Sequence, residues 1–151
     1  MPNKTLLIII AAAVVIAIII VIMLSSKKEE FPYKKKTPFM TLQDRKIIEE
    51  IAEAGYFPFV KVRIADFITT WKNAGYRPKI ASRSVDFLAC DIDSFEPQFA
   101  LVYKSHYGKN TNEFLTQLFM HVNIPLFFVS KNFNSSDMSK IIKAVRQVKK
   151  S

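Results

Sequence analysis

The longest apolar run of the chain comes near its start, where residues 6–24 read LLIIIAAAVVIAIIIVIML. A helix rises about 1.5 Å per residue, so this run is long enough to span the hydrocarbon core of a bilayer, about 30 Å thick. A signal peptide has a shorter apolar region, about 7–15 residues, which ends in a small-x-small cleavage site. The sequence after residue 22, MLSSK, fits such a site poorly. The pattern therefore favours a retained transmembrane helix over residues 6–24.

Lysines flank this helix unevenly. One lysine precedes it, whereas five follow it within residues 27–36. Because lysine and arginine are enriched in cytoplasmic loops, we expect a single-pass protein with a short extracytoplasmic tail, residues 1–5, and a cytoplasmic C-terminal domain. Residues 25–40 also hold glutamates and two prolines, without helical or strand periodicity. They predict a basic linker between the membrane and the domain.

Residues 41–151 carry the patterns of a folded domain. Thr41 and Asp44 form a capping-box-like helix start, the following apolar residues recur on one helical face, and Gly55 ends the helix. The run YFPFVKV, residues 56–62, predicts a strand whose proline suits an edge or a first position. A short helix over residues 63–71 and a polar loop over residues 72–84 follow.

The second half of the domain alternates between strands and helices. Two apolar strands, residues 85–90 and 98–103, are joined by a turn rich in Asp and Pro. Helical spacing recurs over residues 110–122, and a last amphipathic helix starts near Ser136. Between them IPLFFV, residues 124–129, is a continuous apolar run, typical of a strand buried on both faces. This order predicts an α/β domain with a mixed sheet between helices.

Composition removes many functional classes. The three glycines lie far apart, which excludes Walker A loops, dinucleotide fingerprints and nucleophile elbows. One cysteine, Cys90, and two histidines, His106 and His121, are too few for the common Cys-rich zinc sites. A single buried-strand cysteine also excludes an internal disulfide and suits a reducing compartment. These exclusions leave two functional classes: carboxylate chemistry on the predicted hairpin, or binding without chemistry.

The net charge of +9 has two interpretations. Lysines beside a membrane helix contact anionic headgroups, and further basic residues on the domain suit either solvent or a phosphate backbone. The candidate nucleic-acid-binding residues are Lys61, Arg63, Lys104, His106 and Lys109.

The domain resembles the DUF2726 family in the order and spacing of four segments: residues 61–68, 85–91, 100–106 and 123–129. That family is a bacterial group related to the restriction-endonuclease-like, PD-(D/E)xK fold. The resemblance covers roughly residues 40–150 and implies an αβββαβ core with a mixed sheet, behind the transmembrane helix. It also implies a bacterial inner membrane.

The resemblance implies positions for a nuclease site. In the wider class an aspartate and a second carboxylate bind Mg²⁺ or Mn²⁺, the metal activates water, and a lysine two residues after the second carboxylate assists. Asp86 and Lys104 match the aspartate and the lysine. Val102 stands where the second carboxylate belongs, and Glu113 on the next helix is the candidate replacement. His106 matches a histidine that the family tends to place after this strand.

We therefore expect a membrane-anchored, nuclease-like domain that has lost catalysis and binds nucleic acid or membrane-associated proteins. In this form it needs no cofactor. A DNA-handling or secretion assembly is the expected setting. The alternative is an active Mg²⁺- or Mn²⁺-dependent nuclease with Asp86, Glu113 and Lys104 as catalytic residues, the two carboxylates binding the metal. A third interpretation uses the basic surfaces as an additional membrane contact.

Overall fold

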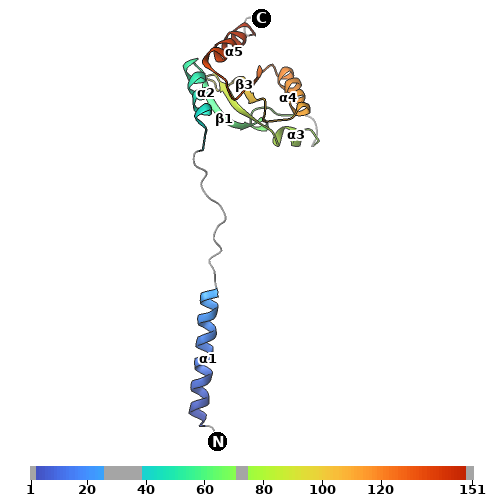
Figure 1. Cartoon of the computed structure of the whole chain (residues 1–151). Helices are drawn as coiled ribbons and strands as arrows, with labels where there is room; N and C mark the ends of the chain where they lie inside the picture. The colour runs from blue at the N-terminus through green and yellow to red at the C-terminus, as the bar shows by residue number, and fades with distance from the viewer. Residues whose placement is uncertain (1–2, 26–38, 71–74, 149–151) are drawn as a thin grey trace. The chain divides into compact units, whose positions relative to one another are not determined.

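The computed structural model describes residues 3–25, 39–70 and 75–148 (Figure 1). The chain divides into two compact units, Met1–Thr37 and Pro38–Ser151. The predicted linker, residues 25–40, and its lysines fall almost wholly outside the described residues.

The described part of the first unit, residues 3–25, is formed by the helix α1, which spans Lys4–Ser25. Its stretch Lys4–Met23 has a mean hydropathy of 3.6, and none of it is buried. A helix that is apolar on all sides needs an apolar environment around it. By length and composition α1 is a candidate membrane span, as the sequence pattern predicts.

The second unit begins with α2, which spans Leu42–Glu53. Its capping box is complete, because the Asp44 N–H donates to Thr41 Oγ1 and the Thr41 N–H donates to Asp44 Oδ2. The chain leaves the helix through Gly55, whose φ of +89° costs a glycine little. Both predicted ends of this helix are confirmed.

Four strands form one mixed sheet in the order β1-β2-β3-β4. The β1–β2 and β2–β3 pairs are antiparallel, whereas β3 and β4 are parallel and are joined through α4. The domain is therefore α/β with a mixed sheet, as predicted. The bounds are β1 Phe57–Arg63, β2 Ser84–Cys90, β3 Pro97–Tyr103, α4 Lys109–His121, β4 Leu126–Val129 and α5 Ser135–Val148.

Helices cover both faces of the sheet (Figure 1). On one face Phe87, Phe99 and Leu101 pack with apolar residues of α2 and α5. On the other face Leu88 and Val102 pack with residues of α4 and of the segment between β1 and β2. Two apolar clusters separated by the sheet give this domain a core of its own.

Three predicted elements differ from the structure. The helix expected over residues 63–71 is a single 3-10 turn, Ile64–Asp66 (η1), in its described part. The expected loop over residues 72–84 contains a short helix, α3, Arg77–Ala81, which is too short to show periodicity. β4 is an edge strand, so Leu126–Val129 is mostly half-buried rather than buried on both faces. β1 is the other edge strand, which agrees with the position of its proline.

Candidate functional site

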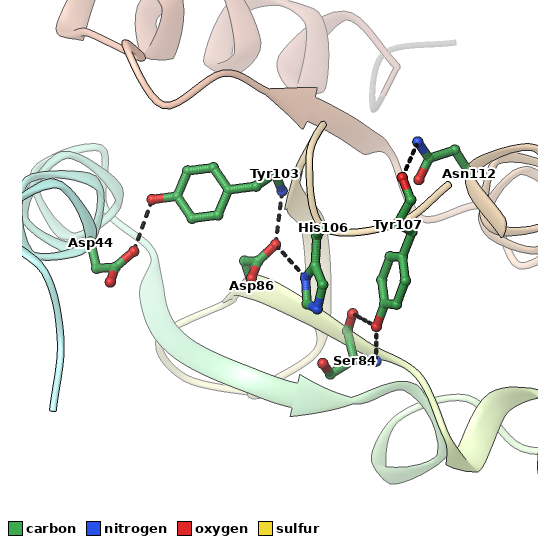
Figure 2. Close-up of polar contacts among 7 residues, drawn as sticks. All are labelled: Asp44, Ser84, Asp86, Tyr103, His106, Tyr107 and Asn112. Atoms are coloured by element: carbon green, nitrogen blue, oxygen red, sulfur yellow. Dashed lines mark hydrogen bonds and ion pairs between the residues drawn. The ribbon is translucent and has the colours of Figure 1, made fainter. Parts of the chain in front are cut away.

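The antiparallel ladder between β2 and β3 ends at the pair Phe87–Leu101. Beyond this pair the Tyr103 N–H donates to Asp86 Oδ2 at 2.8 Å, so a side-chain carboxylate replaces a main-chain carbonyl (Figure 2). Within the described residues, Asp86 is the only buried polar or charged residue, 8% exposed. A buried carboxylate is stable only when hydrogen bonds replace its lost water. Asp86 thus connects the two strands where the ladder stops.

The loop after β3 brings a second partner to this carboxylate. His106 Nδ1 lies 3.0 Å from the same Asp86 Oδ2, and the His106 side chain is about a third exposed, at 35%. The tautomer of His106 sets which of the two atoms donates in this pair. The sequence analysis selected both residues separately, and the structure brings them into contact.

Tyr107 attaches the same loop to the start of β2. Its ring stacks on His106 with centroids 4.1 Å apart and planes 7° apart. Its hydroxyl accepts from the Ser84 N–H at 2.9 Å and donates to the Ser84 carbonyl at 3.0 Å (Figure 2). Asn112 of α4 donates to the Tyr107 carbonyl at 3.4 Å. The loop that carries His106 is therefore held from two sides.

The hydrogen bonds extend from Asp86 to α2 through Tyr103. The Tyr103 hydroxyl donates to Asp44 Oδ1 at 2.8 Å. Burial would raise the pKa of Asp44, but hydrogen bonds from Thr41 and Tyr103, together with the charge of Lys61, outweigh it and hold that pKa below its usual value. Burial, the bond to Asp44 and the two nearby carboxylates raise the pKa of Tyr103. We call these linked residues, Asp44, Ser84, Asp86, Tyr103, His106 and Tyr107, the polar junction.

A small pocket lies beside the polar junction. Asp44, Lys61 and Asp86 line it together with apolar side chains, and about 10 Å³ is open, room for one water. Lys61 lies in β1 with a φ of +52°, which is uncommon for a residue other than glycine. The pocket is too small for an organic ligand.

The predicted lysine and the predicted replacement carboxylate lie elsewhere. Lys104 and Glu113 line an open groove of about 540 Å³ with Tyr107, Lys109 and Asn112. Glu113 is 3.9 Å from Lys109 in an exposed ion pair. Asp86 does not line this groove; it lines the small pocket on the α2 side.

The donor set fits a metal poorly. Among the described residues no three His, Cys, Asp or Glu side chains are grouped so that they could hold a metal ion. Val102, at the position of the missing carboxylate, is 0% exposed and packs in the core. The assignment of Asp86 and Glu113 as joint metal ligands stays a prediction.

The five predicted nucleic-acid-binding residues lie in three places. His106 belongs to the polar junction, where it contacts Asp86. Lys104 and Lys109 lie together at the groove. Lys61 and Arg63 are on β1, the edge strand separated from β3 by β2. Arg63 makes a two-point contact with Asp66, at 3.2 and 3.0 Å.

Sequence reasoning did not find the roles of Asp44, Ser84, Tyr103 and Tyr107. Asp44 was recognised only as a helix cap, and its contact with Tyr103 joins residues far apart in the chain. Tyr103 and Tyr107 carry no motif, since a tyrosine at a strand end is common in any sheet. Only the spatial arrangement shows their connection.

Known proteins offer no guide to this site. Comparison with family models, with curated proteins and with solved structures gave no match to the chain. The similarity to DUF2726 therefore stays a prediction.

Proposed function

We propose that this protein is a membrane-anchored, nucleic-acid-binding module whose domain has a restriction-endonuclease-like core without its catalysis. The resemblance to DUF2726 suggests the core, and the described order α2-β1-β2-β3-α4-β4 is compatible with αβββαβ. The observation that carries the proposal is the engagement of Asp86 in structural hydrogen bonds beside an open groove lined by lysines.

The contacts of Asp86 support the proposed loss of catalysis. One oxygen accepts from the Tyr103 N–H and also faces His106 Nδ1, so a metal at that oxygen would compete with two hydrogen bonds. The second carboxylate is absent at Val102, which is buried. Glu113, the candidate replacement, lines a different hollow from Asp86.

The groove has the chemistry of a phosphate contact. Lys104 and Lys109 supply two exposed cations, and Asn112, Thr116 and Gln117 supply polar groups. Lys104 makes no ion pair with the described acidic residues, so it is free to contact an anion. Lysine contacts to phosphate give sequence-independent, salt-sensitive affinity.

The anchor sets where the domain acts. We place α1 across a bacterial inner membrane with the domain in the cytoplasm, because the five lysines of residues 27–36, after α1, outnumber the single Lys4 at its start. Those lysines would also contact anionic headgroups. Binding would then concentrate nucleic acid at the cytoplasmic face of the membrane, as a DNA-handling or secretion assembly requires.

The test is a binding titration. The full chain in nanodiscs of zwitterionic lipid is titrated with labelled duplex and single-stranded DNA between about 50 and 200 mM salt. We expect affinity to fall steeply with salt. In Lys104→Gln/Lys109→Gln the slope of log affinity against log salt should decrease by about one for each lysine that contacts a phosphate. Lys140→Gln/Lys143→Gln, which neutralises two lysines of α5 outside the groove, is the matched control.

Two outcomes would overturn the proposal. Cleavage that needs Mg²⁺ or Mn²⁺ and disappears in both Asp86→Ala and Glu113→Ala would identify an active nuclease instead. Absent or salt-insensitive binding would exclude nucleic acid and direct the search to a protein partner at the membrane.

A further inference from the structure

A cluster of exposed phenylalanines lies at the other end of the β2–β3 hairpin from the polar junction. Phe57 and Phe59 of β1 are 43% and 38% exposed, and Phe95 of the β2–β3 turn is 54% exposed. The three rings contact one another, with centroids 4.9 Å apart for Phe57–Phe59 and 5.5 Å apart for Phe57–Phe95. Ile92 of the same turn is 53% exposed. We call these four residues the aromatic patch.

The turn that carries Phe95 has a defined conformation. Asp91 Oδ1 accepts from the N–H groups of Asp93 and Ser94, each at 3.0 Å, and the Asp91 N–H donates to the Glu96 carbonyl at 2.9 Å. Phe95 itself has a φ of +57°, an unfavourable region for an aromatic residue. Phe95 therefore has an unfavourable backbone conformation, although its side chain is more than half exposed. A fixed, exposed ring loses little entropy when a partner covers it.

The edge of β1 is a poor template for a further strand. Pro58 has no N–H to donate, and Lys61 has left-handed backbone geometry. A partner would therefore contact the ring faces of Phe57, Phe59 and Phe95 rather than extend the sheet. Large apolar groups grouped on a surface are typical of interaction sites.

The charge next to the aromatic patch selects the partner. Asp93 and Glu96 are exposed, and neither forms an ion pair with the described basic residues. An acidic turn repels the anionic headgroups of a cytoplasmic leaflet, which disfavours lipid. In a two-fold dimer through this patch the same carboxylates would face each other, which disfavours a second copy. A cationic partner has neither problem.

We infer that the aromatic patch is a docking surface for a cationic, apolar segment of a partner protein, in which Lys or Arg residues alternate with large apolar ones. The apolar side chains pack on the three rings, and the cations lie beside Asp93 and Glu96. This inference does not depend on nucleic-acid binding at the groove, which lies on other residues.

The test uses defined peptides as probes. The full chain in zwitterionic nanodiscs is titrated with three labelled peptides of equal length: alternating Leu and Lys, alternating Leu and Glu, and alternating Ser and Lys. Fluorescence anisotropy reports binding. We expect the Leu-Lys peptide to bind at least about tenfold more tightly than either of the others, the ratio that 1.4 kcal/mol represents.

Phe95→Gly is the most informative variant, because glycine adopts the left-handed geometry without cost and the turn should stay folded. It should weaken the Leu-Lys peptide about tenfold or more, as the loss of an anchor residue does. Asp93→Lys/Glu96→Lys should remove the preference for the cationic peptide. Met120→Ser, which removes an exposed apolar side chain of α4 outside the patch, is the control and should change nothing. Thermal unfolding of each variant confirms that the domain is folded.

Several results would overturn the inference. Equal binding of the Leu-Lys and Leu-Glu peptides would remove the charge argument, and unchanged binding in folded Phe95→Gly would remove the patch. Binding of anionic vesicles that is lost in Phe95→Gly would identify a lipid contact instead. A dimer of the chain that dissociates in Phe95→Gly would identify a second copy as the occupant.

Discussion

The two ends of the β2–β3 hairpin treat their side chains in opposite ways. At one end the polar junction buries a carboxylate and supplies it with hydrogen bonds from Tyr103 and His106. At the other end the aromatic patch leaves three phenylalanines 38–54% exposed. Buried polar groups with partners stabilise the fold, whereas exposed apolar groups are available to a partner. Asp86 and His106, residue types common in catalytic sites, therefore make structural contacts here. Phenylalanines, which usually fill a core, form part of the surface.

The strongest test of this contrast is removal of the buried carboxylate. Asp86→Ala leaves the Tyr103 N–H without its acceptor and His106 without its partner. We expect the free energy of unfolding to fall by about 2–3 kcal/mol, as for other buried groups that lose a partner. Urea unfolding followed by circular dichroism measures the change. Asp86→Asn keeps an acceptor oxygen and should lose less; equal stability of Asp86→Ala and the unchanged chain would contradict the structural role.

Tyr103→Phe should lower the free energy of unfolding by about 1 kcal/mol near neutral pH, because it removes the hydrogen bond from the Tyr103 hydroxyl to Asp44. The pKa of Asp44 is lowered in the folded state, so its contribution is present above the unfolded value of about 3.9 and disappears as the pH falls below it. The pKa of Tyr103 is raised, so its contribution is lost as the pH rises above about 10. The difference between the two proteins should therefore be largest from about pH 5 to pH 9. A difference independent of pH would contradict the Asp44–Tyr103 bond.

At the aromatic patch the same kind of deletion should leave stability intact. Phe95→Gly removes a side chain that is more than half exposed and relieves its left-handed geometry. We expect the free energy of unfolding to stay the same or to rise by up to about 1 kcal/mol. A loss above about 1 kcal/mol would show that the ring stabilises the domain and is not reserved for a partner.

The smallest effect is expected at Arg63. Its contact with Asp66 is a two-point ion pair, but the two side chains are 69% and 47% exposed. Pairs of this kind contribute less than about 1 kcal/mol, and salt reduces them further. Arg63→Gln should therefore unfold at nearly the same urea concentration as the unchanged chain. A clear loss of stability would show that β1 depends on this contact.

The parts of the fold that the sequence predicts are those with a local physical signal. The sequence predicted the apolar run of α1, the capping box of α2 and the order of the main strands and helices. α3 was missed because five residues show no periodicity, and the exposure of β4 was missed because a continuous apolar run does not distinguish a central from an edge strand.

The site was less predictable than the fold. Asp86, Lys104 and Glu113 were selected as one group, but Asp86 and Glu113 line different hollows, since side-chain direction depends on the local geometry of each strand and helix. Phe57, Phe59 and Phe95 belong to a strand and a turn whose pattern does not show which rings other elements cover.

The most direct test of the central claim, that Asp86 stabilises the fold and does not bind a catalytic metal, is thermal unfolding in the presence of Mn²⁺. A metal that binds only the folded state raises the melting temperature, because it stabilises that state by RT ln(1 + [metal]/Kd). We predict that Mn²⁺ at matched ionic strength leaves the melting temperature of the full chain unchanged, and that Asp86→Asn melts lower both with and without the metal. An increase with Mn²⁺ in the unchanged chain that disappears in Asp86→Asn would contradict this account and identify Asp86 as a metal ligand.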